Sequence, residues 1–349
     1  MTDRENWLRA WRFQHPERIP VVFAIPAEMW GFYGPDLERL VVKHQMLFPG
    51  FREGSINYDN VRIDERNKQG THVDPWGCIY ESQEEGLPCY VTKHPLQDWG
   101  NLEKFTPPDP EKTNGRGAVD WERTEEHIAR SKAAGGLTSG GLVHGHLFLL
   151  LQDLRGYQNL LMDMVDEHPN LPRLIAMIER FSLHIVRRYI AMGVEVMRYP
   201  EDLGCQDRPM VSPELFRTYI KPAYARLMAP AREAGVVVHM HCDGYLWDLI
   251  DDILETGVDV VNMQDVVNGI DEMARNLKGR VCIDCDIDRQ SVTRFGSPKD
   301  IDDLIHEEVD KLGSAEGGLT LRHGLYSGAP LENVEAIMDA MEKYSLYYS

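Results

Sequence analysis

From about residue 120 onward, short apolar runs alternate with longer segments in which apolar residues recur every three or four positions. The short runs have the length of buried strands, and the longer segments have the period of amphipathic helices. Strands that alternate with helices in this way predict a parallel sheet. The predicted strands span 136–144, 193–199, 235–241, 258–262, 281–287 and 319–322, and the predicted helices span 120–134, 147–164, 169–192, 213–234, 245–255, 270–277, 298–311 and 331–344.

The first 120 residues have a different texture. Helices are predicted at 2–15 and 37–48 and a strand at 19–23, whereas residues 50–120 are rich in glycine, proline and aspartate with short β-like runs. We interpret 50–120 as an elaborated insertion or β-meander inside a single domain, 1–349. From first strand to last there are about eight units, which favours an α/β fold of the (β/α)8 TIM-barrel class with an N-terminal helical and β elaboration.

The composition and net charge of the chain argue against some classes of binding partner. Lys and Arg total 37 against 56 Asp and Glu, a formal charge of −19, which argues against nucleic acid or an anionic membrane as the main partner. The N-terminus is polar, without the apolar region of a signal peptide, and no apolar run is long enough to span a bilayer. We therefore expect a cytoplasmic protein.

The six cysteines are too few for a disulfide scaffold in a chain of this size. Cys282 and Cys285 form a CxxC, but they lie in a predicted strand, which would place their sulfurs on opposite faces. A redox or zinc pair at these two residues remains the alternative interpretation.

The ends of the predicted strands carry the candidate chemistry, because the carboxyl ends of barrel strands form the active face. In the segment 236–244, side-chain alternation places His239, His241 and Asp243 on one face and Cys242 on the other, toward the core. Other strand ends contribute further polar residues: His144, His146, Glu201, Asp202, Asn262, Asp284, Asp286, Arg322 and His323. Residues that only fill the interior of a barrel are expected to be apolar. Histidines and carboxylates that recur at one face therefore indicate a functional site.

Two imidazoles and a carboxylate, from His241, Asp243 and His323, have the composition of a divalent-metal site with open positions, and Glu201 would be a fourth ligand. The alternative is a hydrogen-bonded His241–Asp243 couple, with His323 contacting substrate and no metal. Asp202 is a candidate general acid or base, or else a helix cap.

The remaining candidates are residues that would contact substrate. His144 and His146 have same-face spacing and are either substrate-facing or a ligand pair. After the first predicted strand we expect a loop, which carries Glu28, Trp30 and Tyr33; these residues would cover a pocket or else belong to the core.

Several blocks, in order along nearly the whole chain, resemble the uroporphyrinogen decarboxylase superfamily. The resemblance implies a (β/α)8 barrel, often a homodimer. The blocks are Arg4-Glu-Asn-Trp-Leu8, His15-Pro-Glu-Arg-Ile-Pro-Val21, Asp74-Pro-Trp-Gly77, Leu154-Arg-Gly-Tyr-Gln-Asn-Leu-Leu-Met-Asp163, Glu201-Asp-Leu-Gly-Cys-Gln206, Ser212-Pro-Glu-Leu-Phe216, Lys221-Pro222, His241-Cys-Asp-Gly244, Ile287-Asp-Arg-Gln290 and Pro330-Leu-Glu-Asn333.

Within that superfamily, the chain resembles the cobamide-dependent methyltransferases more than the true decarboxylases. True uroporphyrinogen decarboxylases bind a polycarboxylate with arginines after the first strand, and residues 19–38 contain no Arg or Lys. The methyltransferases carry a zinc site written His-x-Cys…Cys. Here His241 matches the histidine, and Asp243 and His323 stand where the two cysteines would be. A carboxylate and an imidazole are chemically harder metal ligands than the two thiolates they would replace.

The resemblance therefore implies metal-assisted methyl transfer from a small O- or N-methylated substrate to a corrinoid on a partner protein. The metal, which we expect to be zinc, would polarise the leaving heteroatom while Asp202 or His144 supplies a proton. We expect Glu28, Trp30, Tyr33, His146 and His239 to bind substrate. The alternatives are a decarboxylase or lyase acting on a small carboxylate, and a corrinoid- or ligand-binding protein without catalysis.

Overall fold

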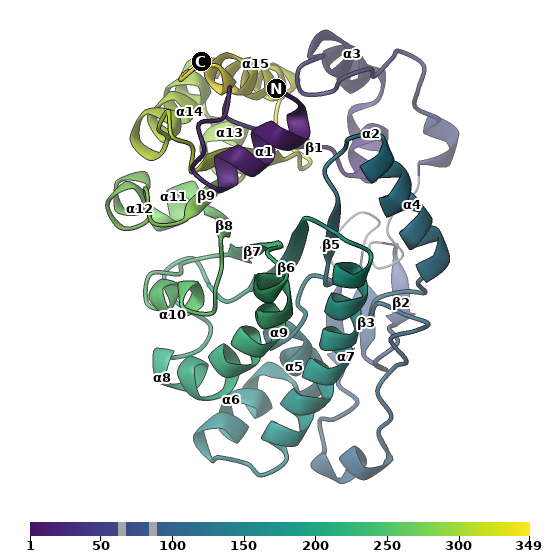
Figure 1. Cartoon of the computed structure of the whole chain (residues 1–349). Helices are drawn as coiled ribbons and strands as arrows, with labels where there is room; N and C mark the ends of the chain where they lie inside the picture. The colour runs from purple at the N-terminus through teal and green to yellow at the C-terminus, as the bar shows by residue number, and fades with distance from the viewer. Residues whose placement is uncertain (62–67, 84–88) are drawn as a thin grey trace. The chain divides into compact units, whose positions relative to one another are not determined.

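The structure is a computed structural model that describes residues 1–61, 68–83 and 89–349 (Figure 1). Residues 62–67 and 84–88, which belong to the predicted insertion, lie outside the described residues. The chain forms two compact units: unit 1 comprises residues 1–64 and 262–349, and unit 2 comprises residues 65–261. The boundary falls inside strand β8 (Val260–Gln264). The expectation of a single domain stays a prediction.

Unit 1 contains three parallel strands in the order β1-β10-β9, with Val21 opposite Leu321 and Leu319 opposite Ile283. The strands are β1 (Val21–Ala24), β10 (Leu319–Gly324) and β9 (Cys282–Asp286). The helices are α1 (Asp3–Trp11), α2 (Ala27–Tyr33), α3 (Pro35–Lys43), η1 (Tyr58–Asn60), α11 (Asp265–Asn268), α12 (Ile270–Asn276), α13 (Val292–Phe295), α14 (Pro298–Leu312) and α15 (Leu331–Ser345).

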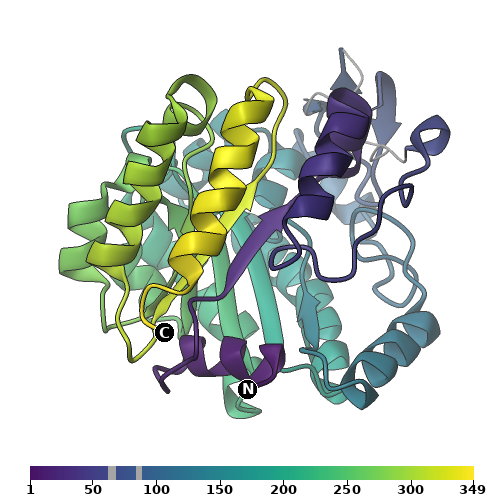
Figure 2. The same cartoon turned by 90° about the horizontal axis from the view of Figure 1, so that it is seen from above.

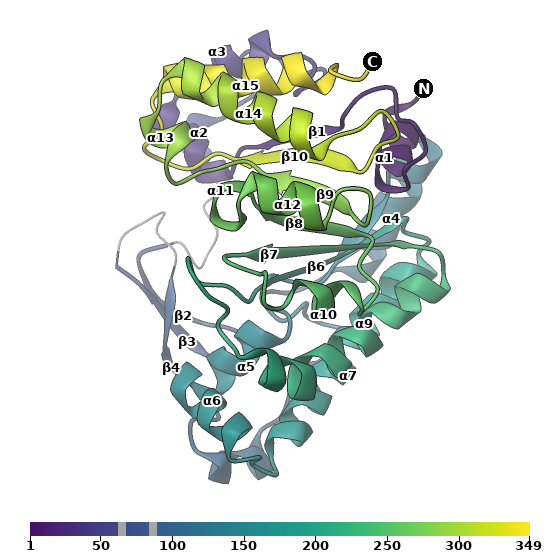
Figure 3. The same cartoon turned by 90° about the vertical axis from the view of Figure 1, so that its left-hand side faces the viewer.

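Helices α14 and α15 lie side by side in unit 1, with α15 packed on β1 (Figures 2 and 3). Ser297 begins α14 through a capping box with Asp300, which satisfies otherwise unpaired N–H groups of the first turn. Ile301, Ile305 and Val309 follow at four-residue spacing and are buried, so one apolar stripe faces the core. The predicted helix 298–311 is confirmed.

Unit 2 contains three parallel strands in the order β7-β6-β5, together with helices α7 and α9 that pack on them (Figure 1). The strands are β5 (Ser139–Gly141), β6 (Val196–Asp202) and β7 (Val237–Asp243). The helices are η3 (Trp99–Lys104), α4 (Trp121–Ala133), α5 (Phe148–Arg155), α6 (Tyr157–Val165), α7 (Leu171–Ala191), α8 (Pro213–Leu215), the π-helix η4 (Phe216–Ile220), α9 (Lys221–Glu233) and α10 (Ile250–Leu254).

The predicted insertion contains an antiparallel meander of β2 (Gly70–Val73), β3 (Ile79–Ser82) and β4 (Tyr90–Lys93). The three short β-like runs of the sequence form these strands, so the prediction of a meander is confirmed. Its inner side carries the buried residues Tyr80 and Ser82, and its outer side is exposed.

Seven strands, β1 and β5 to β10, are each followed along the chain by a helix, which confirms the predicted α/β barrel class of fold. The helix predicted over 147–164 is wrong in one respect. It is interrupted at Gly156, whose φ of +83° is incompatible with helix and separates α5 from α6. Among the described residues, no helix combines the length and the apolar character needed to cross a lipid bilayer.

Candidate metal centre

The ends of β6 and β7 in unit 2 bring polar side chains together. The register pairs Pro200 with His241 and Asp202 with Asp243. Because side chains alternate along parallel strands, Asp202, His241 and Asp243 share one face. Both strands end in tightly packed turns: a Cβ added to Gly244 would lie 2.2 Å from the carbonyl of Gly204, and Gly244 has φ +85°. These turns fix the positions of the two aspartates.

His144 reaches the same place from the segment that follows β5. The backbone N–H of Gly145 donates to the carbonyl of Pro200 at 3.0 Å, which holds this segment against β6. Gly145 has φ +72°, a conformation that favours glycine. A guanidinium N–H of Arg116 also donates to the carbonyl of His144 at 3.3 Å. The backbone of His144 is therefore held from two sides.

Three side chains form a compact cluster of metal-binding atoms: one atom from each of His144, Asp202 and His241 lies within 4.8 Å of the others. Nε2 of His144 donates to Oδ1 of Asp202 at 3.1 Å, and Nε2 of His241 lies 3.7 Å from the same oxygen. Oδ1 of Asp243 lies 3.7 Å from Nε2 of His241. The side chains of His144 and His241 are 44% and 21% exposed, so solvent reaches the cluster.

Mutual interactions dominate the electrostatics of this cluster. Burial alone would lower the pKa of His144, but the hydrogen bond and the negative charge of Asp202 outweigh it, and the pKa is raised above 6.5. Burial alone would raise the pKa of Asp202, but the hydrogen bond from His144 and the charges of both histidines lower it below 3.8. The pair is thus poised as an imidazolium beside a carboxylate, and a metal cation would replace that proton.

Glu201 precedes Asp202 but points to the opposite, fully buried face of β6. Its carboxylate accepts hydrogen bonds from the backbone N–H groups of Leu147, Phe148 and Leu149, at 2.8–3.2 Å, and from the hydroxyl of Tyr224 at 3.0 Å. These N–H groups lie at the start of α5, where a helix provides no carbonyl partner for them. Both oxygens of Glu201 are occupied in this way, so we leave Glu201 out of the metal set proposed below.

His146 and His239 are also buried. Nδ1 of His146 donates to the carbonyl of Pro200 at 3.0 Å, and its ring packs 5.5 Å from that of Tyr224. Burial lowers the pKa of His146, which keeps its ring neutral. The structure thus gives His146 a supporting position behind the cluster, and binding of substrate by these two histidines stays a prediction.

The other predicted site residues belong to unit 1. His323 lies on β10 and is buried. Glu28, Trp30 and Tyr33 lie on α2, a helix where the sequence suggested a loop. Trp30 stacks on Phe51 at 5.6 Å, which is a packing contact. Ligation of metal by His323 and binding of substrate by the three α2 residues stay predictions.

The cysteines are placed as the alternation of side chains predicts. Cys242 is fully buried on the face opposite His241, which confirms that it belongs to the core. Cys282 and Cys285 are also fully buried on β9, where burial raises the pKa of both thiols. A neutral buried thiol is a poor metal ligand and a poor nucleophile.

Sequence reasoning missed the residues that hold the site in place. Arg116 lies in a turn of the insertion and Tyr224 in the first turn of α9. Neither follows a strand, and a tyrosine or arginine in such a position has no distinguishing pattern. An arginine within a run of small residues was the one signal available for Arg116.

Residues 73–344 match the family model of uroporphyrinogen decarboxylase (URO-D). The chain belongs to the URO-D family. This confirms the membership that the sequence blocks indicated, and the match spans the elements that carry every residue of the cluster.

The chain is similar in sequence to one known protein and in structure to another. Chloroplastic uroporphyrinogen decarboxylase 2 of Arabidopsis thaliana is 24% identical over 176 residues, which cover 49% of this chain and 42% of the relative. The match thus spans less than half of that relative's length. A methyltransferase from Methanosarcina mazei is 17% identical, with a TM-score of 0.67 over 99% of each chain. At that identity the likeness shows a shared fold.

Proposed function

We propose that this protein is a metal-dependent methyltransferase that moves a methyl group from a small O- or N-methylated substrate to a corrinoid carried by a partner protein. One observation carries the proposal: the convergence of His144, Asp202 and His241 in a solvent-accessible cluster. The family membership and the shared fold with a methyltransferase support it.

The donor set fits a zinc ion. Ligand atoms at the corners of a zinc tetrahedron with bonds of about 2.0–2.1 Å lie roughly 3.3 Å apart. Oδ1 of Asp202 lies 3.1 Å from Nε2 of His144 and 3.7 Å from Nε2 of His241. Small side-chain adjustments would therefore give two imidazoles and one carboxylate around one cation, with a position left open. Three protein ligands and an open position are typical of catalytic zinc.

The chain's own residues supply binding, orientation and proton transfer. When bound, zinc would act as a Lewis acid toward the heteroatom from which the methyl group departs. His144, Asp202 and His241 hold the cation, which replaces the shared proton of the His144–Asp202 pair. Asp243 lies next to His241 and is 32% exposed, so its carboxylate is placed to pass a proton from solvent to the departing heteroatom.

This arrangement regroups the residues predicted from the sequence. His144 and Asp202, expected to transfer protons, become ligands, and Asp243, expected to be a ligand, becomes the proton carrier. His323 is left out because Arg289 and Arg294 line the same pocket as His323, where their charges disfavour a cation.

The test is metal analysis followed by a methyl-transfer assay. Purified wild-type protein should bind about one zinc ion per chain, and His241→Ala and Asp202→Ala should bind none at the same free zinc concentration. His184→Ala is the matched control, because His184 is a partly exposed histidine of the same unit that pairs with Glu111. A panel of methyl ethers and methylamines with reduced corrinoid would then identify the donor.

Zinc retained equally by His241→Ala and Asp202→Ala would overturn the proposed metal centre. Zinc binding without methyl transfer to any corrinoid, together with release of carbon dioxide from a small acid, would favour the decarboxylase alternative. Corrinoid binding without turnover of any donor would favour a binding protein.

A further inference from the structure

The metal centre proposed above has a further carboxylate directly behind it. Glu201 and Asp202 are consecutive residues of β6, and their side chains point to opposite faces because side chains alternate along a strand. Asp202 contacts the ring of His144, whereas Glu201 bonds to the N–H groups of residues 147–149. One strand therefore holds the segment 144–149 at both of its ends.

The start of α5 depends on Glu201 for its hydrogen bonds. Leu147 occupies the N-cap position, and a leucine side chain has no oxygen with which to accept from the first N–H groups of a helix. The carboxylate of Glu201 takes this role from β6: Oε2 accepts from Leu147 and Phe148 at 3.0 and 2.8 Å, and Oε1 accepts from Leu149 at 3.2 Å. Because Glu201 is fully buried, water cannot readily replace these bonds.

The carboxylate of Glu201 is itself held by Tyr224, whose hydroxyl donates to Oε2 at 3.0 Å. Tyr224 is fully buried. Its ring packs edge to face with that of Phe216 at 6.0 Å and lies 5.5 Å from the ring of His146. The packing of these rings therefore restricts Glu201 to one position.

The position of His144 follows from that of α5. Only Gly145 and His146 separate His144 from the N-cap of this helix. The N–H of Gly145 and Nδ1 of His146 both donate to the carbonyl of Pro200, at 3.0 Å each, so this short link lies against β6. A shift at the start of α5 would therefore change the 3.1 Å contact between Nε2 of His144 and Oδ1 of Asp202.

We propose that Glu201 is a positioning residue for the metal centre: its carboxylate, held by Tyr224, caps α5 and so sets the distance between the ring of His144 and Asp202. The inference rests on the proposed function, in which His144 and Asp202 bind the cation. It can be tested separately from that function, because the contact between the two side chains does not require a metal.

NMR titration of the His144 ring in zinc-free protein tests the inference. Asp202→Asn should lower the pKa of His144, since the hydrogen bond and the charge of Asp202 raise it in the wild type. In the Glu201→Gln background, the same substitution should lower it by about half as much or less, because both interactions weaken with distance. Comparing the two shifts removes the direct effect of the Glu201 charge, which is missing from both members of the Glu201→Gln pair.

Zinc affinity gives a second measurement, by competition with a chromophoric chelator. Glu201→Gln should bind zinc about 10- to 100-fold more weakly, the loss expected when a residue that orients a metal ligand is changed. Tyr224→Phe keeps the carboxylate and the ring but removes the hydroxyl, so its loss should be smaller.

Glu179→Gln is the matched control. Glu179 is a buried carboxylate of α7 in the same unit, where it accepts from Arg226 at 2.6 and 2.8 Å. This substitution should lower stability, while the shift caused by Asp202→Asn and the affinity for zinc stay at their wild-type values. A variant that only loosens the fold would behave like this control.

An Asp202→Asn shift as large in Glu201→Gln as in the wild type would overturn the inference, and would mean that the bonds to Pro200 alone position His144. If Glu201→Gln does not fold, Tyr224→Phe decides the question, and a full shift in that variant would overturn the inference. A wild type that binds no zinc would overturn the proposed metal centre, whereas the titration would still decide the role of Glu201.

Discussion

Unit 2 contains two polar clusters of opposite character. In the first, Arg116, Tyr80, Asp74 and Asp153 lie against the meander with their polar atoms turned toward one another. The hydroxyl of Tyr80 donates to Asp153 at 2.8 Å and accepts from Arg116, which lies 3.9 Å from Asp74. The second cluster, His144, Asp202 and His241, shares one carboxylate oxygen between two histidines and is open to solvent.

The comparison shows how a polar cluster that stabilises the fold differs from one that is suited to bind a ligand. Burial raises the pKa values of Asp74 and Asp153, and their contacts with Tyr80 and Arg116 offset the cost of that burial. In the histidine cluster, the Nε2 atoms of two imidazoles lie 3.1 and 3.7 Å from one carboxylate oxygen, and a cation could bind all three groups at once. The two clusters are also joined, because Arg116 donates to the carbonyl of His144. The closed cluster thus positions the open one.

The largest effect should follow from breaking the closed cluster. Arg116→Met leaves two buried carboxylates without their cation, and we expect the free energy of unfolding to fall by about 3–5 kcal/mol. Urea denaturation at pH 7 measures the loss. The exposed pair Arg173–Glu103 is the control, since Arg173→Gln should change stability by less than about 1 kcal/mol.

The same variant has a predictable pH dependence. A carboxyl whose pKa is raised in the folded state binds its proton more tightly than in the unfolded chain. The stability of Arg116→Met should therefore fall as pH rises from the unfolded pKa, about 3.9, through the raised pKa of Asp153. A loss below about 1 kcal/mol that does not change between pH 4 and pH 8 would mean that this cluster is not closed.

The next effect concerns the open cluster, which should gain stability from a metal instead of from internal contacts. Zinc at 100 times its dissociation constant should stabilise the wild type by about 2.7 kcal/mol. His241→Ala should lose this gain, since even a residue that only orients a ligand changes metal affinity by about 10–100-fold. Thermal unfolding with and without zinc measures the effect. An equal gain in His241→Ala would place the cation elsewhere.

The smallest effect is on protonation. In the metal-free protein, the pKa of His144 lies above 6.5 because Asp202 favours the imidazolium. Asp202→Asn should lower that pKa, as followed by the NMR titration of the His144 ring protons. Since the folded pKa is raised, the stability from this pair is complete below the unfolded pKa and is lost as pH rises through the folded one. An unchanged titration in Asp202→Asn would show that the two side chains are not coupled.

Alternation of side chains was enough to predict part of the site. It placed His241 and Asp243 on one face of a strand and Cys242 in the core. Applied to β6, the same rule separates Glu201 from Asp202, but only the structure shows that Glu201 meets the N–H groups at the start of α5. That contact depends on how far the 142–147 segment runs along β6, which no local pattern encodes.

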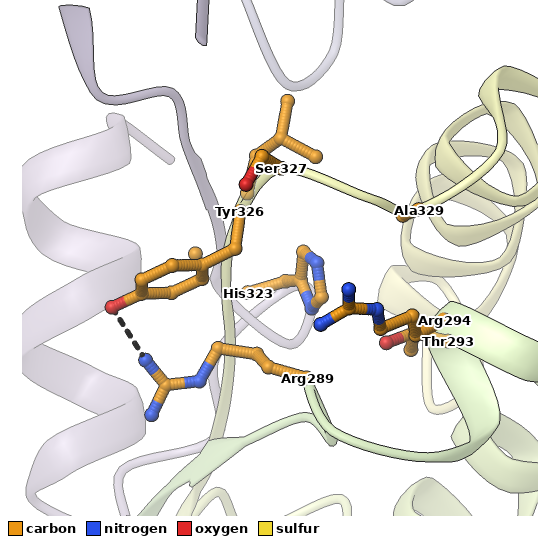
Figure 4. Close-up of a pocket in the computed structure, with 9 residues that line it drawn as sticks. Arg289, Thr293, Arg294, His323, Tyr326, Ser327 and Ala329 are labelled. Atoms are coloured by element: carbon orange, nitrogen blue, oxygen red, sulfur yellow. Dashed lines mark hydrogen bonds between the residues drawn. The ribbon is translucent and has the colours of Figure 1, made fainter. Parts of the chain in front are cut away.

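The periodic pattern of apolar residues could not predict the roles of residues that lie outside the strands. Arg289 precedes the four-residue helix α13 and Arg294 lies within it, and the pocket that they line (Figure 4) is held by Tyr33 and Asn333, which are far away in sequence. The fold class followed from regular alternation of apolar segments, whereas the break at Gly156 depends on a single backbone dihedral angle. Long-range packing therefore decided what local pattern left open.

The central claim is that one cation is held by two imidazoles and one carboxylate. Zinc K-edge X-ray absorption of the zinc-loaded wild type tests it most directly. The account predicts only nitrogen and oxygen neighbours at about 2.0–2.1 Å, including two imidazole rings, and one imidazole fewer in His144→Ala. Sulfur neighbours at about 2.3 Å, or an unchanged spectrum in His144→Ala, would contradict it.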